Sequence, residues 1–200
     1  MFRLILALLL TCLPVKLYAG NILILGDSLS DAYQIPLEKS WPELLSMRLS
    51  KKHPLYRVIN KSESGRTTAG GLARIPVLME EEHPDIVILE LGANDGLRVF
   101  PIPVIYQNLK LIIDTIQAGK AQILLAGVEL PTNYPKDYRR LFTEVFQNLA
   151  DQNDLSFLPF ILEGVHDQPG LMLRDRIHPS VKGQPVILDN IWPVLEPMLD

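Results

Sequence analysis

Ile22-Leu-Ile-Leu-Gly-Asp-Ser-Leu-Ser30 carries the clearest strand signal in the chain. Four apolar residues in a row, stopped by glycine and aspartate, are typical of a short strand that is buried on both faces. Similar runs lie at residues 56–59, 86–91 and 122–127, and a weaker one lies at residues 155–158. Five such runs predict a five-stranded sheet.

Between these runs the sequence has the periodicity of amphipathic helices. Ile105, Leu109, Ile112, Ile113 and Ile116 fall on one helix face. The expected helices span residues 68–81, 104–117, 136–151 and 183–199, and a further one follows Ser40. Strands that alternate with helices predict one parallel sheet covered on both sides, a three-layer α/β/α sandwich. We expect a single domain over residues 20–200.

Two local patterns predict helix ends. Ser40 and Glu43 have the spacing of a capping box, with Pro42 in the first turn. Pro193 lacks the N–H that the carbonyl of Asp189 would accept, so a kink or a break is expected there.

The first nineteen residues have the pattern of a secretory signal peptide. Arg3 precedes an apolar run at residues 4–10, and the segment ends at Ala19. The run is shorter than the roughly 20 apolar residues that span a bilayer. Cleavage after Ala19 would remove the only cysteine, Cys12, and predicts a periplasmic or secreted protein without stable membrane insertion. A lipoprotein anchored at Cys12 is the alternative.

The composition excludes several classes of protein. With 48% hydrophobic and 21% charged residues, the chain is globular rather than disordered. Its net charge of −4 lacks the basic excess that binding to a phosphate backbone requires. We therefore expect no nucleic-acid partner.

The loop that follows the first strand carries a candidate nucleophile. In a parallel sheet, ligands bind outside the carboxyl ends of the strands. Ser28 stands three residues past the strand, where its hydroxyl can project from that edge for nucleophilic acyl transfer. Alternatively, Asp27 and Ser28 only cap a turn. The chain has no G-x-S-x-G motif, which argues against a lipase-type α/β-hydrolase.

A serine nucleophile needs a base, and the chain has four histidines. His53 and His83 precede strands and are expected at the opposite edge. His178 follows the last strand, with Asp175 three residues before it to accept the Nδ1 proton. His166 also follows the last strand and is the second candidate.

Three donors are expected to surround the oxyanion that acyl transfer develops. They are the backbone N–H groups of Ser28 and Gly65 and the side-chain amide of Asn94, which follow three different strands. Separately, Gly65 can be read as a turn glycine and Asn94 as a loop residue, so their convergence carries the prediction.

Four blocks of the sequence resemble the signature of the GDSL or SGNH hydrolases, in the same order. The blocks are Gly26-Asp27-Ser28-Leu29-Ser30, Gly65, Gly92-Ala93-Asn94-Asp95 and Asp175-Arg176-Ile177-His178. The resemblance is greatest to bacterial periplasmic members that act as acyl-CoA thioesterases, lysophospholipases and arylesterases, and it covers nearly the whole mature chain. One departure is Arg66, where those members have an acidic residue after the glycine, which bears on substrate preference.

The resemblance implies a flavodoxin-like SGNH fold and a catalytic set. Ser28 would be the nucleophile, His178 the base and Asp175 its orienting acid, with Ser28, Gly65 and Asn94 as the oxyanion hole. The substrate would be a small acyl ester or thioester, and this chemistry requires no metal or organic cofactor.

An acyl chain is expected in an apolar groove at the same edge. The candidate lining residues are Leu97, Val99, Phe100, Leu130, Pro131 and Tyr134. These residues can equally be ordinary packing under a loop. Residues 96–103, with one glycine and two prolines, are a candidate lid.

Three alternatives to this esterase hypothesis remain. A carbohydrate O-acetyl esterase would use the same catalytic set on a polar, short-acyl substrate. A non-catalytic exported lipid-binding protein would need the groove alone. A phosphotransferase would use Asp27 and Asp31, although their spacing lacks the close carboxylates that Mg²⁺ recruits.

Overall fold

The computed structural model describes residues 20–199, so the predicted signal peptide and Cys12 lie outside the described residues. Five parallel strands form one sheet in the order β2-β1-β3-β4-β5. They are β1 (Gly20–Gly26), β2 (Tyr56–Asn60), β3 (Ile86–Glu90), β4 (Gln122–Ala126) and β5 (Ser156–Leu158). The structure confirms the five-stranded parallel sheet.

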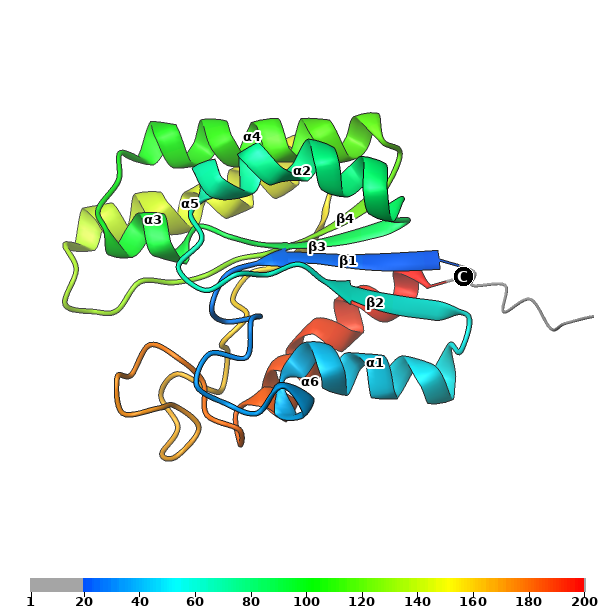
Figure 1. Cartoon of the computed structure of the whole chain (residues 1–200). Coiled ribbons are helices and arrows are strands. Elements are labelled where there is room, and N and C mark those ends of the chain that lie inside the picture. Colours follow the sequence, from blue (N-terminus) through cyan, green and yellow to red (C-terminus); the bar gives the residue numbers. More distant parts are fainter. Residues whose placement is uncertain (1–19, 200) are drawn as a thin grey trace, which may run out of the picture.

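Helices cover both faces of this sheet (Figure 1). On one face lie α1 (Trp41–Lys52) and α6 (Gln184–Leu195). On the other lie α2 (Thr68–Glu82), α3 (Ala93–Leu97), α4 (Ile102–Ala118) and α5 (Lys136–Asn153). Short 3₁₀ turns occupy Leu37–Lys39 and Glu196–Met198. The three-layer α/β/α sandwich is therefore confirmed.

The hydrophobic core lies on both sides of β1 and β3, two neighbouring strands in the interior of the sheet. Every residue of β3 is buried, and residues 22–25 of β1 have no exposed surface. The five apolar residues predicted to share one face of α4 are all fully buried against the sheet layer. Burial on both faces explains why these strands read as unbroken apolar runs.

Two of the predicted helix ends differ in detail from the structure. The helix does begin after Ser40, but the Ser40 hydroxyl donates to the Leu37 carbonyl at 2.7 Å and makes no capping hydrogen bond to the helix. The preceding 3₁₀ turn supplies that nearer acceptor. Helix α6 is not broken at Pro193 but continues to Leu195 and then tightens into the 3₁₀ turn. No helix within residues 20–199 has the length and hydrophobicity that crossing a membrane requires.

All five strands end at the same edge, which is at the left in Figure 1. The loops that leave this edge hold Ser28 and Gly65, the short helix α3 after β3 holds Asn94, and the long connection after β5 holds His178. His53 and His83 end α1 and α2, just before β2 and β3, and so lie at the opposite edge as expected.

Candidate active site

Three side chains meet at the carboxyl edge of the sheet. His178 Nε2 lies 2.9 Å from Ser28 Oγ, and His178 Nδ1 lies 2.8 Å from Asp175 Oδ2. Because a carboxylate only accepts hydrogen bonds, the Nδ1–H of His178 donates to Asp175, which leaves Nε2 to accept the hydroxyl proton of Ser28. This arrangement suits transfer of the serine proton to the imidazole.

The segment that presents His178 is a tight turn built on Asp175. Asp175 Oδ1 accepts the backbone N–H groups of Ile177 and His178, both at 3.0 Å, and Arg176, between Asp175 and Ile177, has a φ of 58°. Burial acts to raise the pKa of Asp175, but the hydrogen bonds from Ile177 and His178 outweigh it, so the pKa lies below its usual value. The carboxylate thus stays ionised while it orients the imidazole.

Tyr33, which the sequence did not suggest, also holds His178. Its ring centroid lies 4.1 Å from that of the imidazole, at an interplanar angle of 33°. Tyr33 belongs to the loop after β1, the same loop that carries Ser28. The contact therefore ties the base to the nucleophile's own loop.

Asn94 is aimed by a buried acid next to Ser28. Its Nδ2 donates to Asp27 Oδ2 at 3.0 Å, and Asp27 Oδ1 accepts the N–H of Leu29 at 3.1 Å. The residue before α3, Gly92, has a φ of 126°, where a Cβ would come within 3.0 Å of the ring of Phe146. Only glycine combines that conformation with that space, so it sets the direction in which α3 starts.

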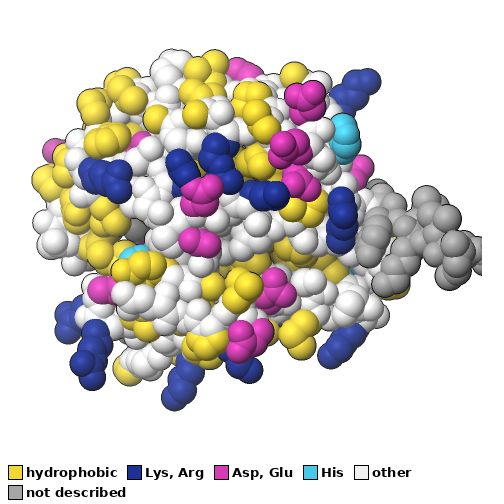
Figure 2. All heavy atoms as spheres, viewed as in Figure 1, with side chains coloured by type: hydrophobic (Ala, Val, Ile, Leu, Met, Phe, Trp, Pro, Cys, Tyr) yellow, Lys and Arg dark blue, Asp and Glu magenta, His cyan; other side chains and the backbone are white. Residues whose placement is uncertain are grey.

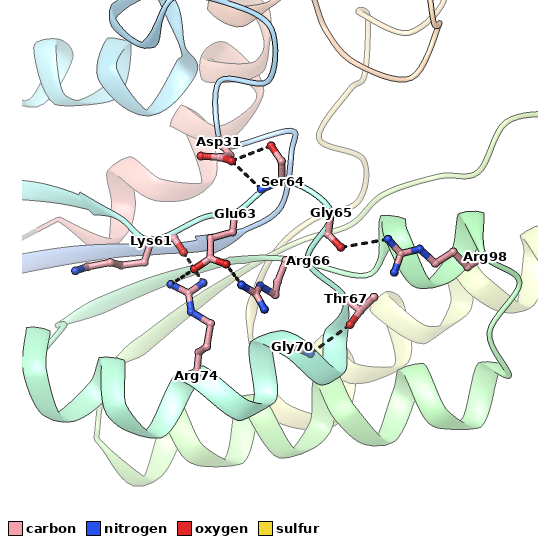
Figure 3. A network of polar contacts seen from close by, with 10 residues as sticks. All are labelled: Asp31, Lys61, Glu63, Ser64, Gly65, Arg66, Thr67, Gly70, Arg74 and Arg98. Carbon is pink, nitrogen blue, oxygen red and sulfur yellow. Dashed lines mark hydrogen bonds and ion pairs between the residues drawn. The ribbon is translucent and has the colours of Figure 1, made fainter.

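The loop that carries Gly65 is held from two sides (Figure 3). On one side Asp31 Oδ2 accepts the N–H and the hydroxyl of Ser64, at 2.7 and 2.8 Å. On the other side Arg98 donates to the Gly65 carbonyl at 3.4 Å. Gly65 itself has a φ of 79°, and its N–H has no hydrogen-bond partner among residues 20–199. The loop thus presents a free backbone donor in a conformation that favours glycine.

Arg66, the departure noted in the sequence, is occupied by an ion pair. It pairs with Glu63, which also binds Arg74 at 2.9 Å (Figure 3). Arg66 does not line the active-site pocket. The Arg66 side chain is therefore engaged within the loop, and Glu63 joins that loop to α2 through Arg74.

Asp95 joins the loop that holds Gly65 to helix α3, which holds Asn94. It is fully buried and accepts both the N–H and the hydroxyl of Thr68, at 2.8 and 2.6 Å. Thr68 begins α2, three residues after Gly65, and Asp95 directly follows Asn94. This clamp fixes the spacing between the two candidate donors.

A third buried carboxyl group, that of Glu90, contacts the nucleophile loop. Glu90 Oε2 accepts the Ser30 hydroxyl at 2.7 Å and the Asp27 N–H at 3.3 Å. Burial, followed by the nearby charge of Asp27, raises the pKa of Glu90 well above its usual value. Burial also raises the pKa of Asp27 from 3.8 to about 6, against the opposing hydrogen bonds from Leu29 and Asn94.

A pocket of about 340 Å³ opens beside Ser28, Asn94 and His178. Of the six predicted lining residues, Leu97, Leu130 and Pro131 line it, whereas Val99, Phe100 and Tyr134 do not. Further lining comes from residues that the sequence did not suggest, namely Phe160, Leu162, Met172 and Ile177. In Figure 2, hydrophobic side chains gather at the left of the view, the end of the molecule where the strands end.

The three residues outside the pocket have other contacts or none. Tyr134 is turned back, and its hydroxyl donates to the Leu97 carbonyl at 2.9 Å. The Phe100 carbonyl accepts the Tyr138 hydroxyl at 2.7 Å, and Val99 is 55% exposed. These contacts order residues 97–100 beside the pocket.

His166, the second candidate base, lines the pocket but does not contact Ser28. Its ring packs against that of Phe160 at 5.1 Å, and its Nδ1 lies 3.4 Å from the Leu162 carbonyl. The structure therefore places His178, and not His166, in contact with the hydroxyl of Ser28.

The chain is similar to known ester hydrolases over most of its length. Residues 24–186 match the GDSL-like Lipase/Acylhydrolase family. An arylesterase of Vibrio mimicus is 43% identical, with 96% of each chain covered. The thioesterase 1/protease 1/lysophospholipase L1 of Escherichia coli K12 is 39% identical over 91% of this chain and 86% of that protein. The crystal structure of TesA superposes with a TM-score of 0.87 at 43% identity, covering 90% of this chain and 99% of that one.

The raised pKa of Asp27 predicts a pH-dependent stability. The folded chain holds the proton of the Asp27 carboxyl group more tightly than the unfolded chain does. Protonation of Asp27 therefore contributes fully to the free energy of unfolding below about pH 4, and this contribution is lost as the pH rises through about 6. Between those values, the free energy of unfolding of the wild type should fall relative to that of Asp27→Asn. Urea denaturation at each pH measures the difference.

Asp175→Asn is the control for this experiment. The pKa of Asp175 is lowered, so the ionised Asp175 contributes to the free energy of unfolding at every pH tested. That contribution is lost only at a lower pH, as the pH falls through the folded-state pKa. A difference between the wild type and Asp27→Asn that stays constant from pH 4 to 7 would show that Asp27 titrates normally.

Proposed function

The chain belongs to the GDSL-like lipase/acylhydrolase family and is an ester hydrolase, and on that premise we propose that it cleaves acyl esters and thioesters through Ser28, His178 and Asp175. The observation that carries this proposal is the pair of hydrogen bonds, 2.9 and 2.8 Å long, that join these three side chains in a line. Nucleophile, base and orienting acid of a serine hydrolase require that geometry.

In the proposed mechanism, His178 Nε2 takes the proton of Ser28 as Oγ attacks the acyl carbonyl. The imidazolium that forms is stabilised by the ionised Asp175. It then gives its proton to the departing alcohol or thiol, and Ser28 is left as an acyl ester. Water activated by the same imidazole attacks this ester, releases the carboxylic acid and regenerates the hydroxyl.

The oxyanion is held by neutral donors in this proposal. The N–H of Gly65 is free to donate, and the Asn94 amide has a second N–H besides the one that Asp27 accepts. With the N–H of Ser28, they come from the ends of three strands of the sheet. Donors that the fold fixes in advance need no reorganisation when the charge develops.

The pocket supports a fatty acyl chain as the acyl group. Leu97, Leu130, Pro131, Phe160 and Leu162 give it an apolar wall beside the reacting groups. An acetyl group on a sugar would leave most of that wall unfilled, so we favour lipid-like esters and thioesters over acetylated carbohydrate. The activities after which the relatives are named, arylesterase, thioesterase and lysophospholipase, agree with that choice.

The contacts of the two acidic residues argue against a phosphotransferase. Asp27 is occupied by Leu29 and Asn94, and Asp31 by Ser64. Both carboxylates serve as acceptors that hold the loops of the site.

A hydrolysis panel tests the substrate class. Acyl-CoA, lysophospholipid, aryl ester and acetylated sugar are compared on the mature protein. We expect the first three to be cleaved and the acetylated sugar to be the poorest substrate, because it cannot fill the apolar pocket. Ser28→Ala, the matched control, should abolish all of these activities. Preference for the acetylated sugar, or activity that survives in Ser28→Ala, would refute the proposal.

Asn94→Ala tests the oxyanion hole. Removing one such donor typically lowers kcat by about a hundredfold to a thousandfold. Because Asn94 acts on the transition state, KM for an aryl ester should change little while kcat falls by that factor. Steady-state kinetics separates the two parameters. A rise in KM with an unchanged kcat would assign Asn94 to substrate binding alone.

We also propose that residues 1–19 direct export and are removed, leaving a periplasmic or secreted domain that starts at Gly20. The apolar run after Arg3 supports this proposal. Intact-mass measurement on protein from a bacterial host should give the mass of residues 20–200. A mass that retains residues 1–19, or one with a lipid attached at Cys12, would contradict cleavage at Ala19.

A further inference from the structure

Three residues separate the active-site pocket from a second hollow. Glu129, Leu130 and Arg139 line both cavities, each of about 340 Å³. Beyond them, the second hollow is lined by Lys136, Arg140, Thr143 and Glu144, three of which carry a charge. The three shared residues therefore form a partition between an apolar space and a charged one.

Arg139 is a charged member of this partition whose side chain has no polar partner within residues 20–199. Its Nε–H is buried and donates to no hydrogen-bond acceptor within residues 20–199, and its guanidinium forms no ion pair there. The next residue, Arg140, differs in both respects, because it is exposed and pairs with Glu144 at 2.8 Å. Packing in the wall, and not an ion pair, is thus what holds the Arg139 side chain.

A guanidinium in the wall of an apolar pocket limits what can bind beside it. Each methylene group that enters apolar surroundings improves binding by about fourfold. A methylene that reaches Arg139 gains nothing comparable, because it would have to displace or dehydrate a charged group.

We infer that Arg139 is the end wall of the acyl pocket and sets the longest acyl chain that the enzyme prefers. This inference rests on the proposed function and specifies its substrate class: acyl esters and thioesters whose chain ends before this residue. In Arg139→Ala, the pocket would open into the hollow bounded by Lys136 and Arg140, so that a longer chain could pass.

The test is the chain-length profile of kcat/KM on p-nitrophenyl esters from four to sixteen carbons, below their aggregation limits. For each protein, kcat/KM is divided by its value for the butyrate ester. For the ester two carbons longer than the wild-type optimum, this ratio should be at least about fourfold higher in Arg139→Ala than in the wild type. Arg139→Lys keeps a long cationic side chain and should retain the wild-type profile. Arg140→Ala is the matched control, because Arg140 lines only the second hollow, and its profile should not change.

Two results would overturn the inference. One is a profile in Arg139→Ala that is unchanged or is scaled equally at all lengths. The other is a fall in kcat/KM of Arg139→Ala for an acyl-CoA that the N-acetylcysteamine thioester of the same acid does not show. That result would mean that Arg139 binds the phosphates of the leaving group. If Arg139→Ala does not fold, Arg139→Met removes the charge and should shift the profile in the same direction.

The outcome is separable from that of the proposed function. Failure of the wild type to hydrolyse any acyl ester, or full activity in Ser28→Ala, would refute the proposed function. An active Arg139→Ala enzyme with the wild-type profile would refute only the role of Arg139.

Discussion

The hydrogen bond between His178 Nε2 and Ser28 Oγ joins two residues that are 150 positions apart in the chain. The rest of the molecule can be understood as the support of that contact. Ser28 follows a strand in the interior of the sheet, and His178 sits on a turn fixed by Asp175 and packed against Tyr33. Without the buried sheet, ordering two such distant loops would cost far more conformational entropy than one hydrogen bond returns.

The same edge contains three fully buried carboxyl groups, Asp27, Glu90 and Asp95. Each accepts hydrogen bonds from a segment that carries a group of the site: Asp27 from Asn94, Glu90 from Ser30, and Asp95 from Thr68. Burying an acid costs free energy, and the raised pKa values of Asp27 and Glu90 reflect that cost. The site is therefore positioned at the expense of stability, as is common for functional sites.

Much of this architecture is readable from the sequence, since buried strands and amphipathic helices have different periodicities and parallel strands bring their loops to one edge. The candidate nucleophile, base and donors could be chosen because they follow the carboxyl ends of the strands and lie in blocks that resemble the GDSL signature. The pocket lining was harder to predict. Val99, Phe100 and Tyr134 are near the site in sequence but turn away, and Phe160 and Met172 come from a connection with no regular periodicity. Side-chain direction in loops depends on hydrogen bonds such as that from Tyr134 to Leu97, which no local pattern encodes.

The contact between Ser28 and His178 is tested by reaction of the protein with a fluorophosphonate, followed by peptide mapping with mass spectrometry. The structure leads us to expect an adduct on Ser28 alone, formed about a hundredfold more slowly in His178→Ala, because the alcohol then lacks its base. An adduct on another serine, or equal labelling rates in the two proteins, would mean that this imidazole does not activate this hydroxyl.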